Sequence, residues 1–172
     1  MNLPISLCSR LAALAVAAGA VLCAGAPAAS AADNWQPGQN VLLKTNINYA
    51  IDDDEYWYKN RTSINVKSNL GFLGYNTKSW TKKISRCGSD EVRAELEFLG
   101  STSWTQRVVV KVRLNLYEGA SCDTQDLDGQ TMWHTYVLDP GQSVQDDIEV
   151  WNGAEGGDYA WTGFDIYAQK AW

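Results

Sequence analysis

From residue 33 onward, hydrophobic and polar residues alternate with a period of two, the pattern of strands that bury one face. The clearest run covers 91–98, where Val92, Leu96 and Phe98 alternate with charged residues. A second run, 104–116, alternates in the same way and begins at Trp104. Because a short connection of small residues separates the two runs, together they predict an antiparallel hairpin.

Further segments with weaker alternation are also expected to be strands. They are 41–51, 62–70, 75–84, 131–138, 143–151 and 159–168. Turn-forming residues such as Pro140-Gly141 and Asn152-Gly153 separate them. The eight segments predict an all-β fold, an antiparallel β-sandwich of immunoglobulin-like or jelly-roll kind, with a closed β-barrel as the alternative. The alternation does not specify the order of the strands.

Residues 1–32 have the features of a secretory signal peptide. Arg10 precedes an apolar run over 11–24, and Ala29-Ser30-Ala31 has the small residues that signal peptidase requires. The run is shorter than the roughly 20 residues that span a bilayer. We therefore expect cleavage before Ala32 or Asp33, followed by secretion of one extracellular domain over 33–172 with no membrane anchor.

Removal of this leader leaves two cysteines, Cys87 and Cys122. Secretion places them in an oxidising environment, where only one pairing is possible. Their wide spacing lacks the CxxC pattern of redox and metal sites. We therefore predict a Cys87–Cys122 disulfide.

The charge of the chain narrows the range of partners. With 14 Lys+Arg against 20 Asp+Glu, the net charge is −6, which argues against a nucleic-acid or anionic-membrane partner. Basic residues concentrate in 59–113 and acidic residues in 114–172. These charges either pair across the surface, the interpretation we favour, or form an acidic end that attracts cations. We expect a monomer.

Two acidic clusters are candidates for binding a hard cation. Asp52–Glu55 places four carboxylates in a row after a predicted strand, and Asp123, Asp126 and Asp128 precede Gly129. Calcium takes six to eight oxygen ligands, which loops rich in Asp can supply. The second cluster lacks the spacing of an EF-hand, so we favour a solvated acidic turn over a calcium site and expect no cofactor.

Aromatic and acidic residues share one face of the last two predicted strands. Trp151 alternates in phase with Glu149, and Trp161 and Tyr167 alternate in phase with Asp165. If the strands are neighbours, these side chains form one patch. Aromatic rings suit the C–H faces of sugars, and carboxylates accept hydrogen bonds from hydroxyls. Exposed Trp and Tyr equally suit an extracellular protein partner, and packing under loops is the alternative to either.

A second aromatic group, Tyr56 and Trp57, follows the Asp52–Glu55 run. We expect these residues in a loop, and loops on a rigid scaffold often carry recognition residues. The alternative is an aromatic plug that closes one end of the sandwich.

Catalytic signals are weak, so we expect a binding module rather than an enzyme. His134, the only histidine, is expected within a strand in a structural role. The carboxylate pair Glu149 and Asp165 supports an alternative function as a small secreted hydrolase. A further alternative is an extracellular protease inhibitor that presents the loop 119–129 around Cys122.

Overall fold

The computed structural model describes residues 35–55, 58–152 and 157–171, and this part of the chain contains strands and no helix. The strands are β1 (Asn40–Glu55), β2 (Tyr58–Gly74), β3 (Ser79–Cys87), β4 (Arg93–Thr102), β5 (Val108–Tyr117), β6 (Leu127–Gln130), β7 (His134–Leu138), β8 (Ser143–Trp151) and β9 (Tyr159–Ala171). A helix able to cross a membrane is likewise not found among these residues.

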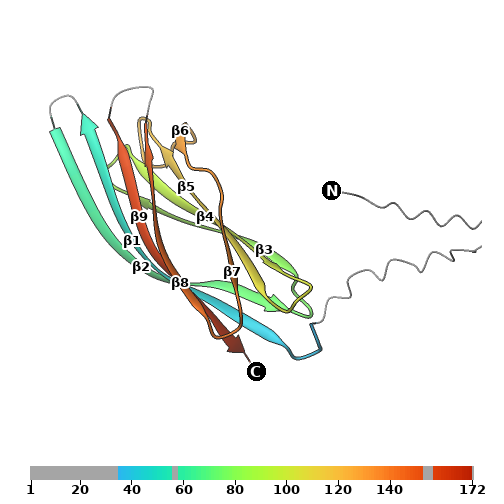
Figure 1. Ribbon diagram of the computed structural model, residues 1–172. Helices are drawn as coiled ribbons and strands as arrows, with labels where there is room; N and C mark the ends of the chain where they lie inside the picture. The colour runs from blue at the N-terminus through green and yellow to red at the C-terminus, as the bar shows by residue number, and fades with distance from the viewer. Residues whose placement is uncertain (1–34, 56–57, 153–156, 172) are drawn as a thin grey trace, which may run out of the picture. The chain divides into compact units, whose positions relative to one another are not determined.

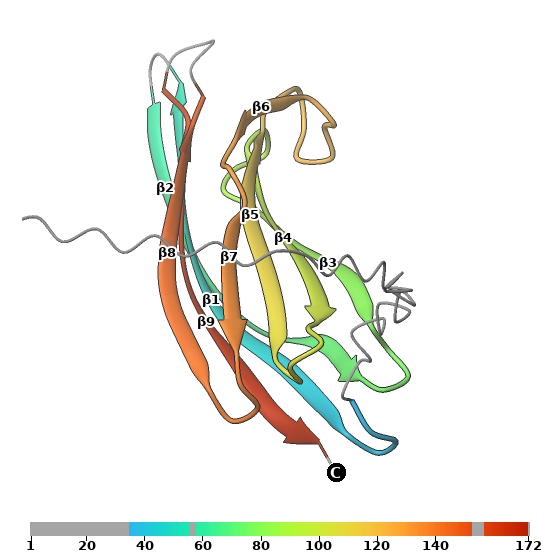
Figure 2. The same cartoon turned by 45° about the vertical axis from the view of Figure 1, so that its right-hand side comes forward.

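The strands form two antiparallel sheets that face each other. Sheet A has the order β2-β1-β9-β8, and sheet B has the order β3-β4-β5-β6, with β7 also pairing with β5 (Figure 1). Figure 2 shows β8, β9, β1 and β2 in one layer and β7, β5, β4 and β3 in the other. The predicted antiparallel β-sandwich is confirmed, and within the described strands neither sheet closes into a barrel.

The core lies between the sheets and consists of the apolar side of the alternation described above. Leu96 and Phe98 of β4 and Phe164 of β9 are among the side chains that are almost completely buried. Tyr49 of β1 crosses the core, and its hydroxyl donates a 2.6 Å hydrogen bond to the carbonyl of Ile84 in β3. This bond joins the two sheets through a buried polar group that would otherwise lack a partner.

The Cys87–Cys122 disulfide is confirmed, with 5.9 Å between the Cα atoms. It fastens the loop after β5 to the end of the edge strand β3. Arg93 of β4 lies between them, with its guanidinium 4.3 Å from the Tyr117 ring centre and a 3.1 Å hydrogen bond to the Cys122 carbonyl. The covalent bond and the arginine together hold this loop against sheet B.

Three local predictions differ from the structure. Asp52 and its acidic neighbours do not follow a strand but continue β1, because β2 pairs with this segment to its end. Trp104 lies in the turn between β4 and β5, where it is 61% exposed. Gln106 in that turn has a left-handed φ of 63°, which ends the alternation before β5 begins. The short β6 falls where a loop was expected.

Candidate functional site

The predicted aromatic–acidic patch depends on β8 and β9 being neighbours, and they are. Glu149 lies opposite Trp161, and Trp151 lies opposite Tyr159. Because side chains alternate between faces, these residues share the outer face of sheet A, while Ile148, Val150, Phe164 and Ile166 face the core. Trp151 is 60% exposed and Tyr167 39% exposed, so the patch lies at the surface and is not packed under loops.

Trp161 forms one wall of a hollow in the middle of this face. Three atoms of its six-membered ring lie 2.8–3.5 Å from the position that a Cβ atom of Gly163 would occupy. The ring therefore covers the space left by the missing side chain. Its indole N–H donates a 3.0 Å hydrogen bond to Asp147 of β8, which fixes the ring in this position. Trp161 is half-buried, so part of the ring surface remains accessible.

Polar side chains from three strands surround the Trp161 ring. The hollow is lined by Asn48, Gln145, Asp146, Asp147, Trp161, Gly163, Phe164 and Asp165. Asn48 comes from β1, which pairs with β9 opposite Gly163. The arrangement places an aromatic surface beside carboxylate and amide groups, the combination that binds a ring bearing hydroxyl groups.

A second hollow lies further along the same face, toward the turn after β8. The rings of Trp151 and Tyr159 are in contact there, with centres 4.2 Å apart and planes tilted by 42°, and the Tyr159 hydroxyl donates a 3.0 Å hydrogen bond to Glu149. Burial and this hydrogen bond both raise the pKa of Tyr159. On the β2 side, Arg61 forms an ion pair of 2.7 Å with Asp52.

Tyr167 and Asp165 complete the face at its other end. The Tyr167 hydroxyl donates a 3.2 Å hydrogen bond to Asp165, and the side-chain amide of Asn46 in β1 lies 3.5 Å from the same hydroxyl. The structure thus places all five residues predicted on β8 and β9 on one face of sheet A, spread along the length of the two strands. Tyr56 and Trp57, the other predicted group, lie outside the described residues.

Sequence reasoning missed the contribution of β1. Asn46 and Asn48 belong to this face only because β1 pairs with β9, more than 110 residues away along the chain. No local pattern in the sequence indicates that pairing. Gln145 and Asp147 alternate in phase with Glu149 and Trp151, but their position beside Trp161 depends on the register of β8 against β9.

The geometry does not support Glu149 and Asp165 as a catalytic pair. Asp165 lies opposite Gln145, four residues from Glu149, which corresponds to about 13 Å along a strand. Glycosidase carboxylates lie roughly 5–9.5 Å apart. The side chains also turn away from each other, because each accepts a hydrogen bond from a tyrosine on its far side. His134 begins β7 and is exposed, not enclosed within a strand.

The three carboxylates predicted as a weak calcium site lie between β5 and the end of β6. Asp128 accepts a 2.8 Å hydrogen bond from the backbone N–H of Glu118, and Asp123 and Asp126 are exposed. Among the described residues, no three acidic, histidine or cysteine side chains form a group that would hold a metal ion. The calcium hypothesis for Asp123, Asp126 and Asp128 therefore gains no support from their positions.

Glu118 of the loop after β5 meets the turn between β8 and β9. Its carboxyl accepts a 2.5 Å hydrogen bond from the Asn152 side chain and shares another with the buried Asp158. The hydrogen bond with Asp158, together with burial, raises the pKa of Glu118 to about 7. This contact ties the two sheets together at the end of the sandwich where the disulfide also lies.

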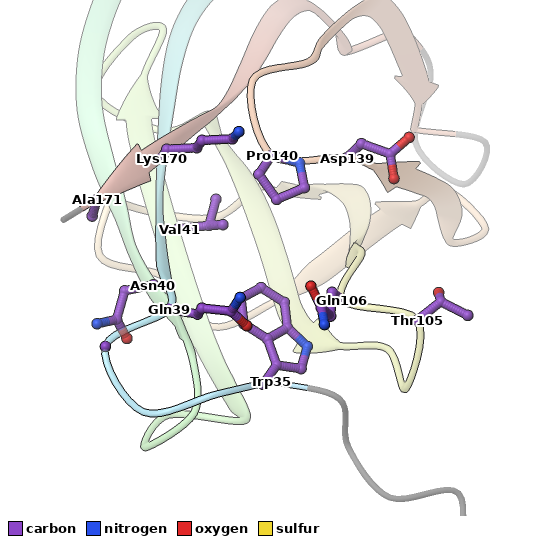
Figure 3. A pocket seen from close by; sticks show the side chains of 11 residues that line it. Trp35, Gln39, Asn40, Val41, Thr105, Gln106, Asp139, Pro140, Lys170 and Ala171 are labelled. Atoms are coloured by element: carbon purple, nitrogen blue, oxygen red, sulfur yellow. The ribbon is translucent and has the colours of Figure 1, made fainter.

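A separate hollow of about 470 Å³ lies at the opposite end, around the start of β1 and the end of β9. Figure 3 shows Trp35 at its centre, with Val41 and Pro140 above the ring and Gln106 beside it. Trp35 is almost completely buried, and its indole N–H donates a 3.0 Å hydrogen bond to the Ser103 carbonyl. Trp35 therefore packs against the β4–β5 turn as part of the core.

Comparisons with known proteins do not place the chain in a family. No protein-family model matches it, and no curated protein sequence matches it. One solved structure aligned with it is the secretin InvG (residues 176 to the end) of the Salmonella SPI-1 type III secretion injectisome, in the open gate state. The alignment covers 78% of this chain and 59% of the secretin chain at 8% identity, with a TM-score of 0.34. A similarity this low carries no argument about function.

Proposed function

We propose that the chain is a secreted binding module that recognises carbohydrate through the outer face of β8 and β9. The observation that carries the proposal is the hollow in which the Trp161 ring lies over Gly163, beside the side chains of Asp147 and Asn48. A sugar ring would place its C–H face against the indole and its hydroxyls against the carboxylate and amide groups.

Rigidity of the face supports this function. Trp161 and Tyr159 are each held by a hydrogen bond to a carboxylate of β8, and both come from a strand in the interior of sheet A. Side chains that are already ordered lose little conformational entropy when a ligand binds. The disulfide is compatible with the oxidising compartment that secretion implies.

The test is an array of neutral, acidic and amine-bearing oligosaccharides, followed by titration of any glycan that binds. We expect Trp161→Ala to weaken binding about tenfold or more, since buried aromatic anchors dominate recognition. Trp151→Ala is expected to weaken binding less, because Trp151 lies at the edge of the face and contacts Tyr159.

Trp104→Ala is the matched control, because Trp104 is exposed to the same extent as Trp151 but lies in the turn between β4 and β5. Binding should be unchanged in this variant. The proposal is wrong if no glycan binds while a protein captured from culture medium depends on Trp161. That result would assign the face to a protein partner.

A further inference from the structure

The carboxylates of the β8/β9 surface have aromatic partners in place of cationic ones. Asp147 accepts from the Trp161 indole at 3.0 Å, Glu149 from the Tyr159 hydroxyl at 3.0 Å, and Asp165 from the Tyr167 hydroxyl at 3.2 Å. Among the described residues, none of these three carboxylates forms an ion pair. A carboxylate has about four acceptor positions, so each retains capacity for a further donor.

The positive charges of this face come from β1 and β2, and none of them lines the Trp161 hollow. Arg61 of β2 is paired with Asp52 and borders the hollow of Trp151 and Tyr159, while Lys44 of β1 lies opposite Tyr167. The β8 segment contains no lysine or arginine, and the lone lysine of β9, Lys170, lies near the end of the strand, where it borders a hollow with Tyr167 and Lys44. The negative charge of this face is therefore concentrated around the Trp161 hollow, whose described lining contains Asp147 and Asp165 and no cation.

The aromatic rings, like the carboxylates, favour a positively charged ligand. The face of an aromatic ring is negative and attracts ammonium groups, an interaction that persists at exposed sites. The Trp161 ring beside Asp147 and the contacting rings of Trp151 and Tyr159 beside Glu149 each combine the two attractions. Anionic sugars, in contrast, would meet unpaired carboxylates on approach, and like charges in contact disfavour binding.

We propose that the carbohydrate recognised by this face carries protonated amino groups, as oligomers of glucosamine do. The inference rests on the proposed function and deepens it. The Trp161 hollow accepts the sugar ring, and Asp147, Glu149 and Asp165 accept hydrogen bonds from ammonium groups along the oligomer. The packing of the Trp161 ring over Gly163 is an observation independent of the charges, and it places the ring next to them.

The experiment compares three hexasaccharides by isothermal titration calorimetry on the full mature chain: glucosamine, N-acetylglucosamine and galacturonate. The glucosamine oligomer should bind several-fold more tightly than its acetylated counterpart at low salt. This preference should shrink when the ionic strength is raised to about 0.5 M, because salt screens exposed charges. The galacturonate oligomer should bind most weakly.

Charge-neutralising variants identify the groups responsible. Asp147→Asn/Glu149→Gln keeps the oxygen acceptors for Trp161 and Tyr159, so the rings stay in position. We expect it to lose the preference for glucosamine, with each carboxylate worth about two- to fivefold in affinity. Asp123→Asn/Asp126→Asn is the control, because it removes the same net charge from exposed positions in the loop after β5. The control should keep the preference.

The two proposals fail in different ways. If the acetylated oligomer binds as well as the amine and Trp161→Ala abolishes both, the charge inference is wrong and carbohydrate binding stands. A preference for glucosamine that survives Asp147→Asn/Glu149→Gln also overturns the charge inference. If none of the hexasaccharides binds and no other glycan does, both proposals are wrong.

Discussion

The outer faces of both sheets carry carboxylates and aromatic rings, but the partners of these groups differ between the two sheets. On sheet B, Glu95 is 8% exposed and accepts hydrogen bonds from Lys83 at 2.9 Å and Ser85 at 3.0 Å. Glu97 on the same face pairs with Arg113 at 2.7 Å, and that guanidinium lies 4.4 Å from the Trp133 ring centre. On the outer face of sheet A, Asp147, Glu149 and Asp165 each accept a hydrogen bond from an aromatic N–H or O–H group.

The difference separates a surface whose carboxylates stabilise the fold through ion pairs from one whose carboxylates can accept further hydrogen bonds from a ligand. Sheet B neutralises its carboxylates with neighbouring cations and covers its aromatic rings with guanidinium groups. On β8 and β9 of sheet A, the described carboxylates Asp147, Glu149 and Asp165 position the rings and form no ion pair. Aromatic and acidic content alone does not distinguish the two faces, whereas the positions of the lysines and arginines do.

The largest effect expected on the structural side comes from removing the disulfide. Replacing Cys87 and Cys122 together by Ser should lower the free energy of unfolding by about 4 kcal/mol, because the bond closes a long loop in the unfolded chain. Chemical denaturation of the oxidised wild type and the double variant measures this. Glycan binding at 25 °C should persist in whatever fraction remains folded, since the disulfide contacts sheet B. Loss of binding by fully folded protein would contradict the separation of the two faces.

The next prediction compares the contributions of Glu95 and Glu149 to the free energy of unfolding. Glu95→Ala should lower the free energy of unfolding by about 2 kcal/mol, because it leaves Lys83, Asn115 and Tyr117 without their shared acceptor. Glu149→Ala removes an exposed carboxylate and should change it by less than about 0.5 kcal/mol. Urea denaturation of both variants measures the contrast. Equal losses would mean that the β8 carboxylates are structural too, and the comparison would fail.

A smaller effect concerns pH at the end of the sandwich, where Glu118 joins the sheets. Its raised pKa means that the folded state binds the proton more tightly than the unfolded chain does. The stabilisation is therefore fully present below pH 4.5 and is lost as the pH rises through about 7. Denaturation at a series of pH values should show this fall, and Glu118→Gln should remove it.

The stabilisation that Glu95 contributes has the opposite pH dependence, so Glu95 serves as the control for Glu118. Burial raises its pKa, but the hydrogen bonds from Lys83 and Ser85 outweigh burial and lower the pKa overall. Its stabilisation is present above the unfolded pKa and is lost as the pH falls through the lower folded value. Glu95→Gln should therefore leave the decline between pH 4.5 and 7 intact, and a decline that disappears in this variant would contradict the assignment to Glu118.

Sequence alternation predicted the parts of the fold that depend on local chemistry. It placed Trp151, Trp161 and Asp165 on one face because strand side chains alternate strictly, and the two cysteines that follow the predicted leader allowed only one pairing. The prediction was wrong at Trp104. Gln106, which has a left-handed backbone conformation, forms a turn there although the sequence alternation looks continuous. The prediction was also wrong at Asp52, where pairing with Arg61 extends a strand through residues of low strand propensity.

The part that sequence did not predict is the part that depends on distant pairing. The neighbour of β9 on one side is β8, which a short turn indicates, and on the other side is β1, which no turn indicates. The sequence also did not predict that Glu95 is buried and Glu149 exposed, since both residues alternate with apolar residues. The donors that neighbouring strands bring to Glu95 distinguish the two glutamates: Lys83 and Ser85 from β3, and Asn115 and Tyr117 from β5.

Gly163 separates the shape of the candidate site from its chemistry. A methyl group at this position would lie 2.8 Å from the Trp161 ring and force the ring to move, while the charged and amide groups of the face would keep their chemical identity. Gly163→Ala would therefore change the shape of the hollow without changing the charge around it. The shape of the candidate site and its charge depend on different positions, so selection or engineering can alter one while keeping the other.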